Sequence, residues 1–236
     1  MKFGDSIIEM MYEPWAENYL HYNALKQFVK RIGLIESEPD DAANFARRQD
    51  SLGDAEEALW IAIEQQLSKV STFMQEEVAR TRDRLDAVML KIEEVRALQL
   101  FLQSKVDPRN PSVLQELLTD GVYGPITASA VEYYLTSLGG GQGDLPEADP
   151  SSLDEMAHVC AAVDMVREYG MLNYLALLKI VKKHAKWSKS DSIKDRVKKM
   201  LPTQFLYTGE GLFELVCKAE TVVAGDVSVA RARVKA

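Results

Sequence analysis

The sequence has few cysteines and few residues that break helices. Its 236 residues include only 2 cysteines, 8 prolines and 13 glycines. Cys160 and Cys217 stand in apolar, helix-forming surroundings. They show no metal-ligand spacing, and two such cysteines suggest no disulfide framework. We expect both to be buried free thiols in a reducing compartment. With 47% hydrophobic and 27% charged residues, the composition also excludes global disorder.

Membrane and targeting signals are missing as well. No apolar run approaches the roughly 18 residues of a membrane-spanning helix, and we expect no secretory signal peptide. Lys2 occupies the position that N-myristoylation reserves for glycine. We therefore expect a protein of the cytoplasm, of the cytosolic face of a membrane if it belongs to a larger polypeptide, or of the nucleus.

The sequence contains no recognisable catalytic motif. It has no glycine-rich phosphate loop, no nucleophile motif, and no cluster of His, Cys and carboxylate residues at metal spacing. His184 stands among lysines without an acidic neighbour to orient it, so we expect it at the surface or at a helix end. We predict no enzyme activity, no catalytic residue, no metal and no cofactor.

What the sequence does contain is long-range helical periodicity. Over residues 54–104, apolar residues recur mostly at 3-4 spacing and no proline or later glycine interrupts them, which predicts roughly 75 Å of helix. A second long helix is predicted over residues 151–187, although Gly170 lies within it and glycine weakens a helix interior. Helices of this length must pack lengthwise, in the manner of a coiled coil.

Shorter elements complete the prediction. An amphipathic segment at 2–12, broken at Pro14, and a helix over 16–32 form an N-terminal helical hairpin. Residues 35–54 are acidic and polar and predict a loop. Further short helices are predicted over 112–118, 127–138, 190–200 and 210–223.

The predicted fold is therefore all-α. It has an N-terminal hairpin packed on a bundle with two long coiled-coil-like helices and short C-terminal helices. We assign residues 1–224 to one domain. Residues 105–150 form a long linker or insertion between the long helices, and residues 225–236 form a tail or the start of a linker.

A row of lysines stands out because the net charge is −8. Lys179, Lys182 and Lys186 project from one side of the second long helix, and Lys183 flanks them. Stacked like charges repel each other, so this row is either a solvated face or a local anion site. On the same helix, four apolar positions are predicted to face a core: Leu172, Leu175, Leu178 and Val181.

Three stretches in the order of the chain, with a closing segment, resemble the SPX domain of eukaryotic phosphate-homeostasis proteins. The match covers almost the whole chain. The stretches are residues 1–4, Trp15 and 19–26 (family pattern MKFG…W…Y..Y..LK), 66–73 (EL.KV..F), 173–186 (N.TAF.KI.KK.DK), and 202–205 with 212–220.

The third stretch departs from the family pattern at three positions. Leu175 replaces a threonine, Leu177 an aromatic residue and Ala185 an acidic residue. None of these positions contacts ligand in the family, so the departures leave the implied site intact. Residues 105–150 are longer than a minimal SPX linker.

The resemblance implies a phosphate-status sensor that binds inositol polyphosphates, inositol pyrophosphates above all, on a basic surface cluster. The family's ligand-binding positions match Tyr22, Lys26, Lys179, Lys182 and Lys186, with Lys2, Lys30 and Lys183 as outer contributors. The implied output is control of a partner protein or an attached domain: a transcription factor, transporter, polyphosphate polymerase, phosphodiesterase or ubiquitin ligase.

The residues by themselves agree with this implication. Tyr22, Lys26 and Lys30 form a second basic stripe, which we expect at the surface. It can meet the lysine row of the second long helix only if the hairpin packs beside that helix. Lysines approaching from several directions suit a densely phosphorylated ring, and Tyr22 can add a neutral donor.

Two alternatives stay open. One is a helical scaffold that docks an acidic protein or a phospholipid headgroup through its basic helix. The other is nucleic-acid binding over residues 179–199, against which the acidic balance of the chain counts.

Overall fold

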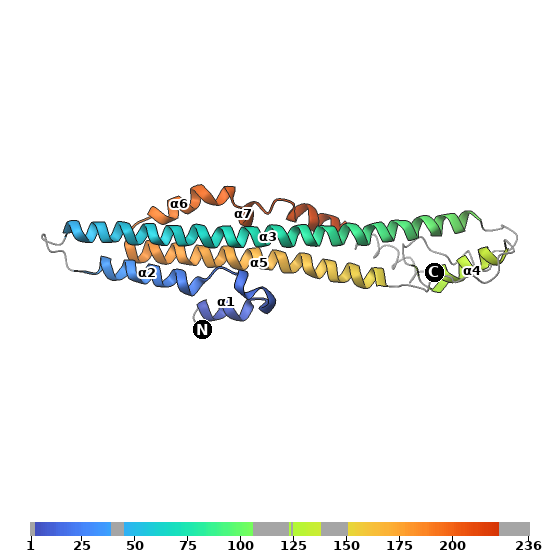
Figure 1. Cartoon of the computed structure of the whole chain (residues 1–236), viewed down its shortest axis with the longest axis horizontal. Coiled ribbons are helices and arrows are strands. Elements are labelled where there is room, and N and C mark those ends of the chain that lie inside the picture. Colours follow the sequence, from blue (N-terminus) through green and yellow to red (C-terminus); the bar gives the residue numbers. More distant parts are fainter. Residues whose placement is uncertain (1–2, 39–44, 106–122, 124, 138–150, 222–236) are drawn as a thin grey trace. The chain divides into compact units, whose positions relative to one another are not determined.

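The computed structural model describes residues 3–38, 45–105, 123, 125–137 and 151–221. All elements in these ranges are helices (Figure 1), which confirms the all-α prediction. In chain order they are α1 (Phe3–Met10), the 3-10 helix η1 (Glu13–Asn18), α2 (Tyr22–Glu36), α3 (Phe45–Ser104), α4 (Pro125–Ser137), α5 (Ser151–Ser188), α6 (Ser192–Met200), the 3-10 helix η2 (Leu201–Thr203) and α7 (Phe205–Thr208). Residues 212–221 are also helical.

The two long helices match their predicted ranges except at the start of α3. This helix begins at Phe45, nine residues before the predicted start at position 54. The loop predicted over 35–54 is therefore wrong for residues 45–54, and it is also wrong for residues 35 and 36, because α2 ends at Glu36. The helix predicted over 16–32 is wrong at its start, where the 3-10 helix η1 ends at Asn18 and α2 begins at Tyr22. The segment contains no proline, and Arg48 ties it to the end of α2 by donating to the Glu38 carbonyl at 3.0 Å. Polar composition alone therefore misled the loop prediction, because an exposed helix turn can be equally polar.

The chain divides into two compact units, each built from a part of α3 and a part of α5. The first unit comprises residues 1–79 and 164–213, and the second comprises residues 80–163 and 214–236. The single domain assigned to residues 1–224 stays a prediction.

In each unit α3 and α5 run antiparallel. In the first unit Glu56 bonds His184, and an ideal Cβ on Gly170 would lie 2.9 Å from Cε of Met74. In the second unit Lys91 and Glu155 form an ion pair at 2.8 Å. In the first unit the contacts on α5 move backward as α3 advances, which is the lengthwise packing the periodicity predicted. Gly170 allows Met74 to approach the helix backbone.

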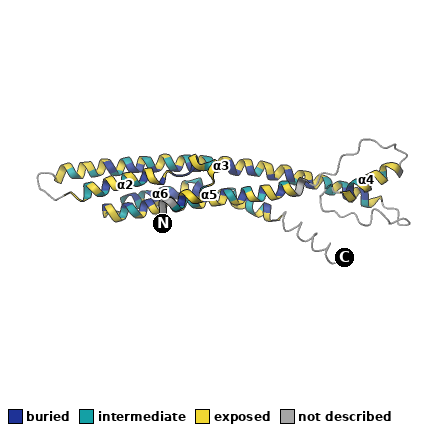
Figure 2. Cartoon of the chain, turned by 90° about the horizontal axis from the view of Figure 1, so that it is seen from below, coloured by how far each residue is buried: buried dark blue, intermediate teal, exposed yellow. Residues whose placement is uncertain are grey.

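The core of the first unit is formed by one face of each helix. Figure 2 shows helices with buried positions on one side and exposed positions on the other. Burying a large aliphatic side chain stabilises a fold by about 1.5–3 kcal/mol, so this shared core fixes where α2 lies. The buried positions include Leu25, Val29 and Ile32 on α2, Leu59, Ile63 and Leu67 on α3, and Leu177 and Ile180 on α5.

The core-facing side predicted for α5 is partly wrong. Val181 is buried and Leu172 is half-buried, but Leu175 and Leu178 are exposed. The buried face instead includes Asn173, Ala176, Leu177 and Ile180. Leucines stand on both sides of this helix, so 3-4 spacing alone could not choose between two apolar faces.

The second unit has its own apolar contacts. Leu102 and Ala130 pack with Leu98, Val131 and Tyr134, which anchors α4 to the end of α3. Beside them the buried Gln99 side chain donates to Oγ1 of Thr127 at 3.1 Å. The short helix predicted over 112–118 lies outside the described residues.

Both cysteines are free thiols, but the prediction that they are buried is wrong. Cys160 is half-buried and Cys217 is exposed. Among the described helices, none carries an apolar stretch long enough to cross a bilayer.

Candidate anion-binding site

Two contacts hold α2 beside the C-terminal part of α5 (Figure 1). At the start of α2, Nζ of Lys183 lies 5.5 Å from the centroid of the Tyr22 ring, a cation–π contact. Towards its end, an ideal Cβ on Gly33 would fall 2.3 Å from Cε3 of Trp187. Only glycine allows the indole ring to approach α2 so closely. The hairpin therefore packs beside the second long helix, as convergence of the two basic stripes requires.

The lysines of α2 lie between these two contact points. At about 100° per residue, Lys26 lies about 20° and Lys30 about 60° round the helix from Gly33, on the side away from the core. Lys26 is half-buried and Lys30 is exposed. Both therefore stand on the outer side of the line along which α2 meets α5.

The lysines of α5 stand on the outer side of the same line. Seen along the helix axis, Lys179, Lys186 and Lys182 are rotated from Lys183 by about 40°, 60° and 100°. All three rotations lead away from the buried Ile180. Lys179, Lys182 and Lys186 are exposed, and Lys183, which contacts the Tyr22 ring, is half-buried. The predicted lysines thus flank one contact line from both helices. Lys2 lies outside the described residues.

Tyr22 is buried, which contradicts the expectation that it lies at the surface. Only 4% of the residue is exposed. Eight residues turn a helix by about 80° beyond two full turns, so the stripe that begins at Tyr22 rotates outward before it reaches Lys30. Tyr22 therefore contacts Lys183 through the face of its ring.

The start of α2 is pinned by polar contacts from α3 and α5. The Leu20 amide donates to Oδ1 of Asn173 at 2.7 Å, and the His21 amide donates to Oε1 of Gln66 at 2.9 Å. Nζ of Lys69 donates to the carbonyls of Glu17 and Tyr19, both at 2.8 Å. Burial lowers the pKa of Lys69. These contacts fix where Tyr22 and Lys26 lie.

Gln66, Lys69 and Asn173 belong to the stretches that resemble the SPX family, but no role could be predicted for them from the sequence. The structure assigns them to positioning the hairpin. Aromatic rings also hold the hairpin against α3 and α5. The Trp15 ring lies 5.3 Å from that of Phe73 and 5.8 Å from that of Tyr169. The Tyr169 hydroxyl donates to the Asn18 carbonyl at 2.8 Å. No local pattern could reveal these pairings, because most of them join residues more than 40 positions apart.

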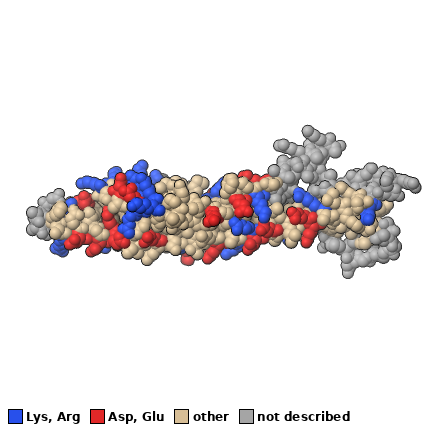
Figure 3. All heavy atoms as spheres, turned by 90° about the horizontal axis from the view of Figure 1, so that it is seen from above, with Lys and Arg blue, Asp and Glu red and all other residues tan. Residues whose placement is uncertain are grey.

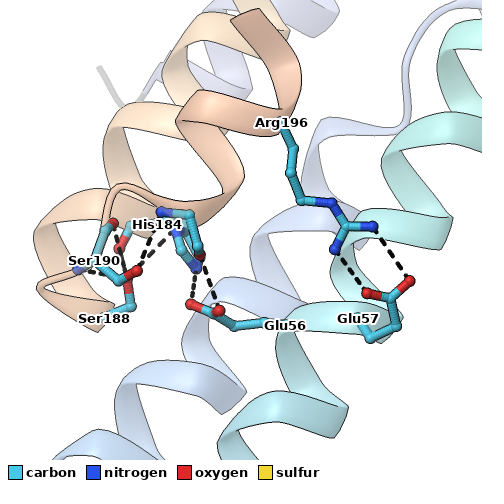
Figure 4. Close-up of polar contacts among 7 residues, drawn as sticks. Glu56, Glu57, His184, Ser188, Ser190 and Arg196 are labelled. Carbon is cyan, nitrogen blue, oxygen red and sulfur yellow. Dashed lines mark hydrogen bonds and ion pairs between the residues drawn. The ribbon is translucent and has the colours of Figure 1, made fainter. Parts of the chain in front are cut away.

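The His184 side chain lies against the Glu56 carboxylate (Figure 4). It is fully buried, and its Nε2 lies 2.9 Å from Oε1 of Glu56 on α3, while Ser192 on α6 donates to Oε2 of the same carboxylate at 2.9 Å. Burial lowers the pKa of His184, and Glu56 opposes that shift. The expectation of a surface histidine is wrong, because its acidic partner is 128 positions away.

Ser188, His184 and Glu56 lie in the order of a serine–histidine–carboxylate triad. Oγ of Ser188 is 3.4 Å from Nδ1 of His184. However, the same hydroxyl donates to the His184 carbonyl at 2.9 Å, and Ser188 is only 5% exposed. A nucleophile needs access to its substrate, so we interpret this group as structural. The described residues hold no group of three or more His, Cys, Asp or Glu side chains placed to bind a metal.

The basic residues of α6 lie on a different face and are partly neutralised. Arg196 donates two hydrogen bonds to Glu57, at 2.6 and 3.3 Å, and its guanidinium lies 4.3 Å from the centroid of the Trp60 ring. The Arg196 hydrogen bond lowers the pKa of Glu57. Figure 3 shows basic side chains gathered over α6 with acidic ones directly beside them. The lysine-rich stretch 179–199 is therefore not one continuous surface.

Comparison with solved structures identifies a protein of similar fold. It is the SPX domain of Chaetomium thermophilum glycerophosphodiester phosphodiesterase 1, in complex with inositol hexakisphosphate. The TM-score is 0.57 at 15% sequence identity, over 95% of this chain and 98% of that chain. The chain has the SPX fold.

This result confirms the fold that the three stretches implied. No protein-family model and no curated protein sequence match the chain. At 15% identity the likeness establishes the SPX fold alone, because one fold can carry different binding sites.

Proposed function

We propose that this chain binds inositol polyphosphates, inositol pyrophosphates above all, along the outer side of the α2–α5 contact. The proposed ligand contacts are Lys26, Lys179, Lys182 and Lys186, with Lys2, Lys30 and Lys183 as outer contributors. Tyr22, predicted with them, is buried, and its proposed part is to position Lys183. The observation that carries the proposal is that Tyr22–Lys183 and Gly33–Trp187 hold lysines from two helices along one line. The neighbour of the same fold was solved with inositol hexakisphosphate.

Positive charge is crowded on the exposed face of α5. Lys179, Lys182 and Lys186 follow one another on an exposed helix face, where like charges repel. A polyanion converts that repulsion into several charge-assisted hydrogen bonds at once. Because the ligand binds only the folded arrangement of α2 and α5, binding should also stabilise the fold.

The proposed role is a regulatory, non-catalytic sensor of phosphate status. A bound polyphosphate changes the charge of this face from positive to negative, which alters what a partner protein or an attached domain meets there. The partner classes are those that the SPX resemblance implies, and the proposed location is the cytoplasm, the cytosolic face of a membrane or the nucleus.

Calorimetric titration with an inositol pyrophosphate, inositol hexakisphosphate and free phosphate tests the proposal at near-physiological salt. We expect tight binding of the pyrophosphate, weak binding of free phosphate, and loss of binding in a Lys179→Ala, Lys182→Ala, Lys186→Ala variant. The matched control is Lys194→Ala, Lys198→Ala, Lys199→Ala, which removes the same charge from α6. Equal losses in both variants, or weak binding of every polyanion that salt abolishes, would favour a scaffold with a general basic surface.

A further inference from the structure

The exposed face of α5 carries a regular stripe whose composition changes along the helix. Its members recur at spacings of three and four, and each is exposed. At about 100° per residue they lie within about 60° of a line through Leu175, so they form one strip of surface. In order they are Asp164, Glu168, Met171, Leu175, Leu178, Lys182 and Lys186, which we call the α5 stripe.

The apolar centre of the α5 stripe is not covered by the described part of the chain. Met171, Leu175 and Leu178 are 54%, 41% and 40% exposed. Contacts with other helices lie on both sides of the stripe. On one side the Tyr174 ring lies 6.3 Å from that of Tyr207 on α7, and on the other side Lys183 contacts the ring of Tyr22 on α2. Three large apolar side chains at helical spacing are typical of a surface that packs against another helix.

The charges of the stripe are self-complementary when the helix is reversed. Glu168 and Lys182 each lie seven residues from Leu175, on opposite sides, and Asp164 and Lys186 each lie eleven residues from it. An antiparallel copy therefore places Lys182 opposite Glu168, and Lys186 opposite Asp164. Leu175 falls on the two-fold axis and meets Leu175 of the second copy. This is the pattern that an isologous interface requires.

We infer that the α5 stripe is the interface of a two-fold symmetric, antiparallel dimer of this chain. A parallel pair would set lysine against lysine and carboxylate against carboxylate. An anionic bilayer or a uniformly acidic helix would be repelled by Asp164 and Glu168. A second copy satisfies both charged ends and covers the apolar centre.

One intrachain contact must rearrange in the dimer. Asp164 pairs with Arg167 at 3.0 Å, but both side chains are more than half exposed. Exposed pairs of this kind contribute little to stability, so exchange of Asp164 to Lys186 of the second copy costs little. A single helix face buries less area than a standard interface, so we expect reversible association in the micromolar range.

The dimer also regulates the proposed ligand site. Lys182 and Lys186 belong both to the stripe and to the polyphosphate cluster, so one lysine pair cannot serve both at once. This part rests on the proposed function: a ligand that binds only the monomer shifts the equilibrium towards it.

Sedimentation of the chain over a range of concentrations tests the interface. Leu175→Asp, Glu168→Lys and Lys182→Glu should each weaken dimerisation at least tenfold, whereas the double variant Glu168→Lys, Lys182→Glu should restore it because the charges are exchanged. Circular dichroism checks that every variant is folded. A monomeric wild-type chain, or a folded double variant that fails to regain the dimer, would overturn the inference.

A cross-link tests the two-fold axis itself. Helices packed about 8–10 Å apart bring facing Cα atoms within disulfide range. In a Cys160→Ser, Cys217→Ser background, Leu175→Cys should form an intermolecular disulfide on mild oxidation, and Leu178→Cys, off the axis, should do so more slowly. Equal rates would contradict the proposed register.

Addition of inositol hexakisphosphate separates the two proposals. If calorimetry shows binding, the dimer should dissociate, and a dimer that persists with ligand bound would refute the competition alone. If calorimetry shows no binding, the proposed function fails, while the charge-exchange result still decides the dimer.

Discussion

The indole ring of Trp187 occupies the space that any side chain at Gly33 would need. Three atoms of the ring lie 2.3, 3.1 and 3.2 Å from an ideal Cβ at that position. The contact joins the last turn of α5 to α2, beyond Lys26 and Lys30. The distance between the two lysine groups therefore depends on a residue that carries no charge.

Gly33→Ala should push α2 away from α5. We expect a loss of about 1–3 kcal/mol in the free energy of unfolding from overpacking, partly offset by the better helix propensity of alanine. Affinity for inositol hexakisphosphate should fall with it. Urea unfolding and calorimetry measure the two effects.

A second substitution tests whether the affinity loss comes from the Gly33–Trp187 contact or from general destabilisation of the fold. Gly33→Ala combined with Trp187→Leu should recover part of the lost affinity, because the smaller side chain leaves room for the new methyl group. If Gly33→Ala alone binds the ligand as the wild type does, the spacing of α2 and α5 is not set here.

Loss of the buried histidine should destabilise the first unit. His184→Ala leaves the Glu56 carboxylate with one partner fewer and opens a cavity, so we expect a loss of about 2–4 kcal/mol in the free energy of unfolding. Thermal unfolding measures it. The control is His158→Ala on the exposed face of α5, which should change stability by less than about 0.5 kcal/mol.

The same histidine should make stability depend on pH. Burial lowers its pKa in the folded chain below the ordinary value of 6.5, so the unfolded chain binds the proton first as the pH falls. Stability should therefore be unaffected by this group above about pH 7 and should decrease as the pH falls through 6.5 towards the lower folded pKa. Urea unfolding between pH 7.5 and 5 measures the slope. A His184→Gln variant with an unchanged slope would assign the dependence to other groups.

Ligand should raise the unfolding temperature. At a hundredfold excess over Kd, a ligand that binds only the folded chain adds about 2.7 kcal/mol to the free energy of unfolding. Thermal unfolding with inositol hexakisphosphate should show this shift in the wild type and in the α6 control variant. The shift should be absent when Lys179, Lys182 and Lys186 are alanine, and its survival there would place the ligand elsewhere.

The sequence predicted what depends on local periodicity. α5 ends one residue from its predicted end, and the exposed lysine row follows from the spacing of Lys179, Lys182 and Lys186. The SPX fold itself was implied by short stretches such as the one that contains Asn173.

Properties that depend on distant partners could not be predicted. His184 is buried and bonded because Glu56 reaches it from α3. Tyr22 is buried because α2 packs against α5 at that residue. Leu175 and Leu178 are exposed because the core contacts the other apolar face of α5. In each case the deciding neighbour lies on another helix.

In the proposed complex, lysines from α2 and α5 bind the same ligand molecule. Calorimetric titration with an inositol pyrophosphate, using Lys26→Ala and Lys179→Ala separately, tests it most directly. We expect one site per chain and about a tenfold loss of affinity in each variant, or about 1.4 kcal/mol. Full affinity in a folded Lys26→Ala variant, with loss only in Lys179→Ala, would show that the ligand binds α5 alone.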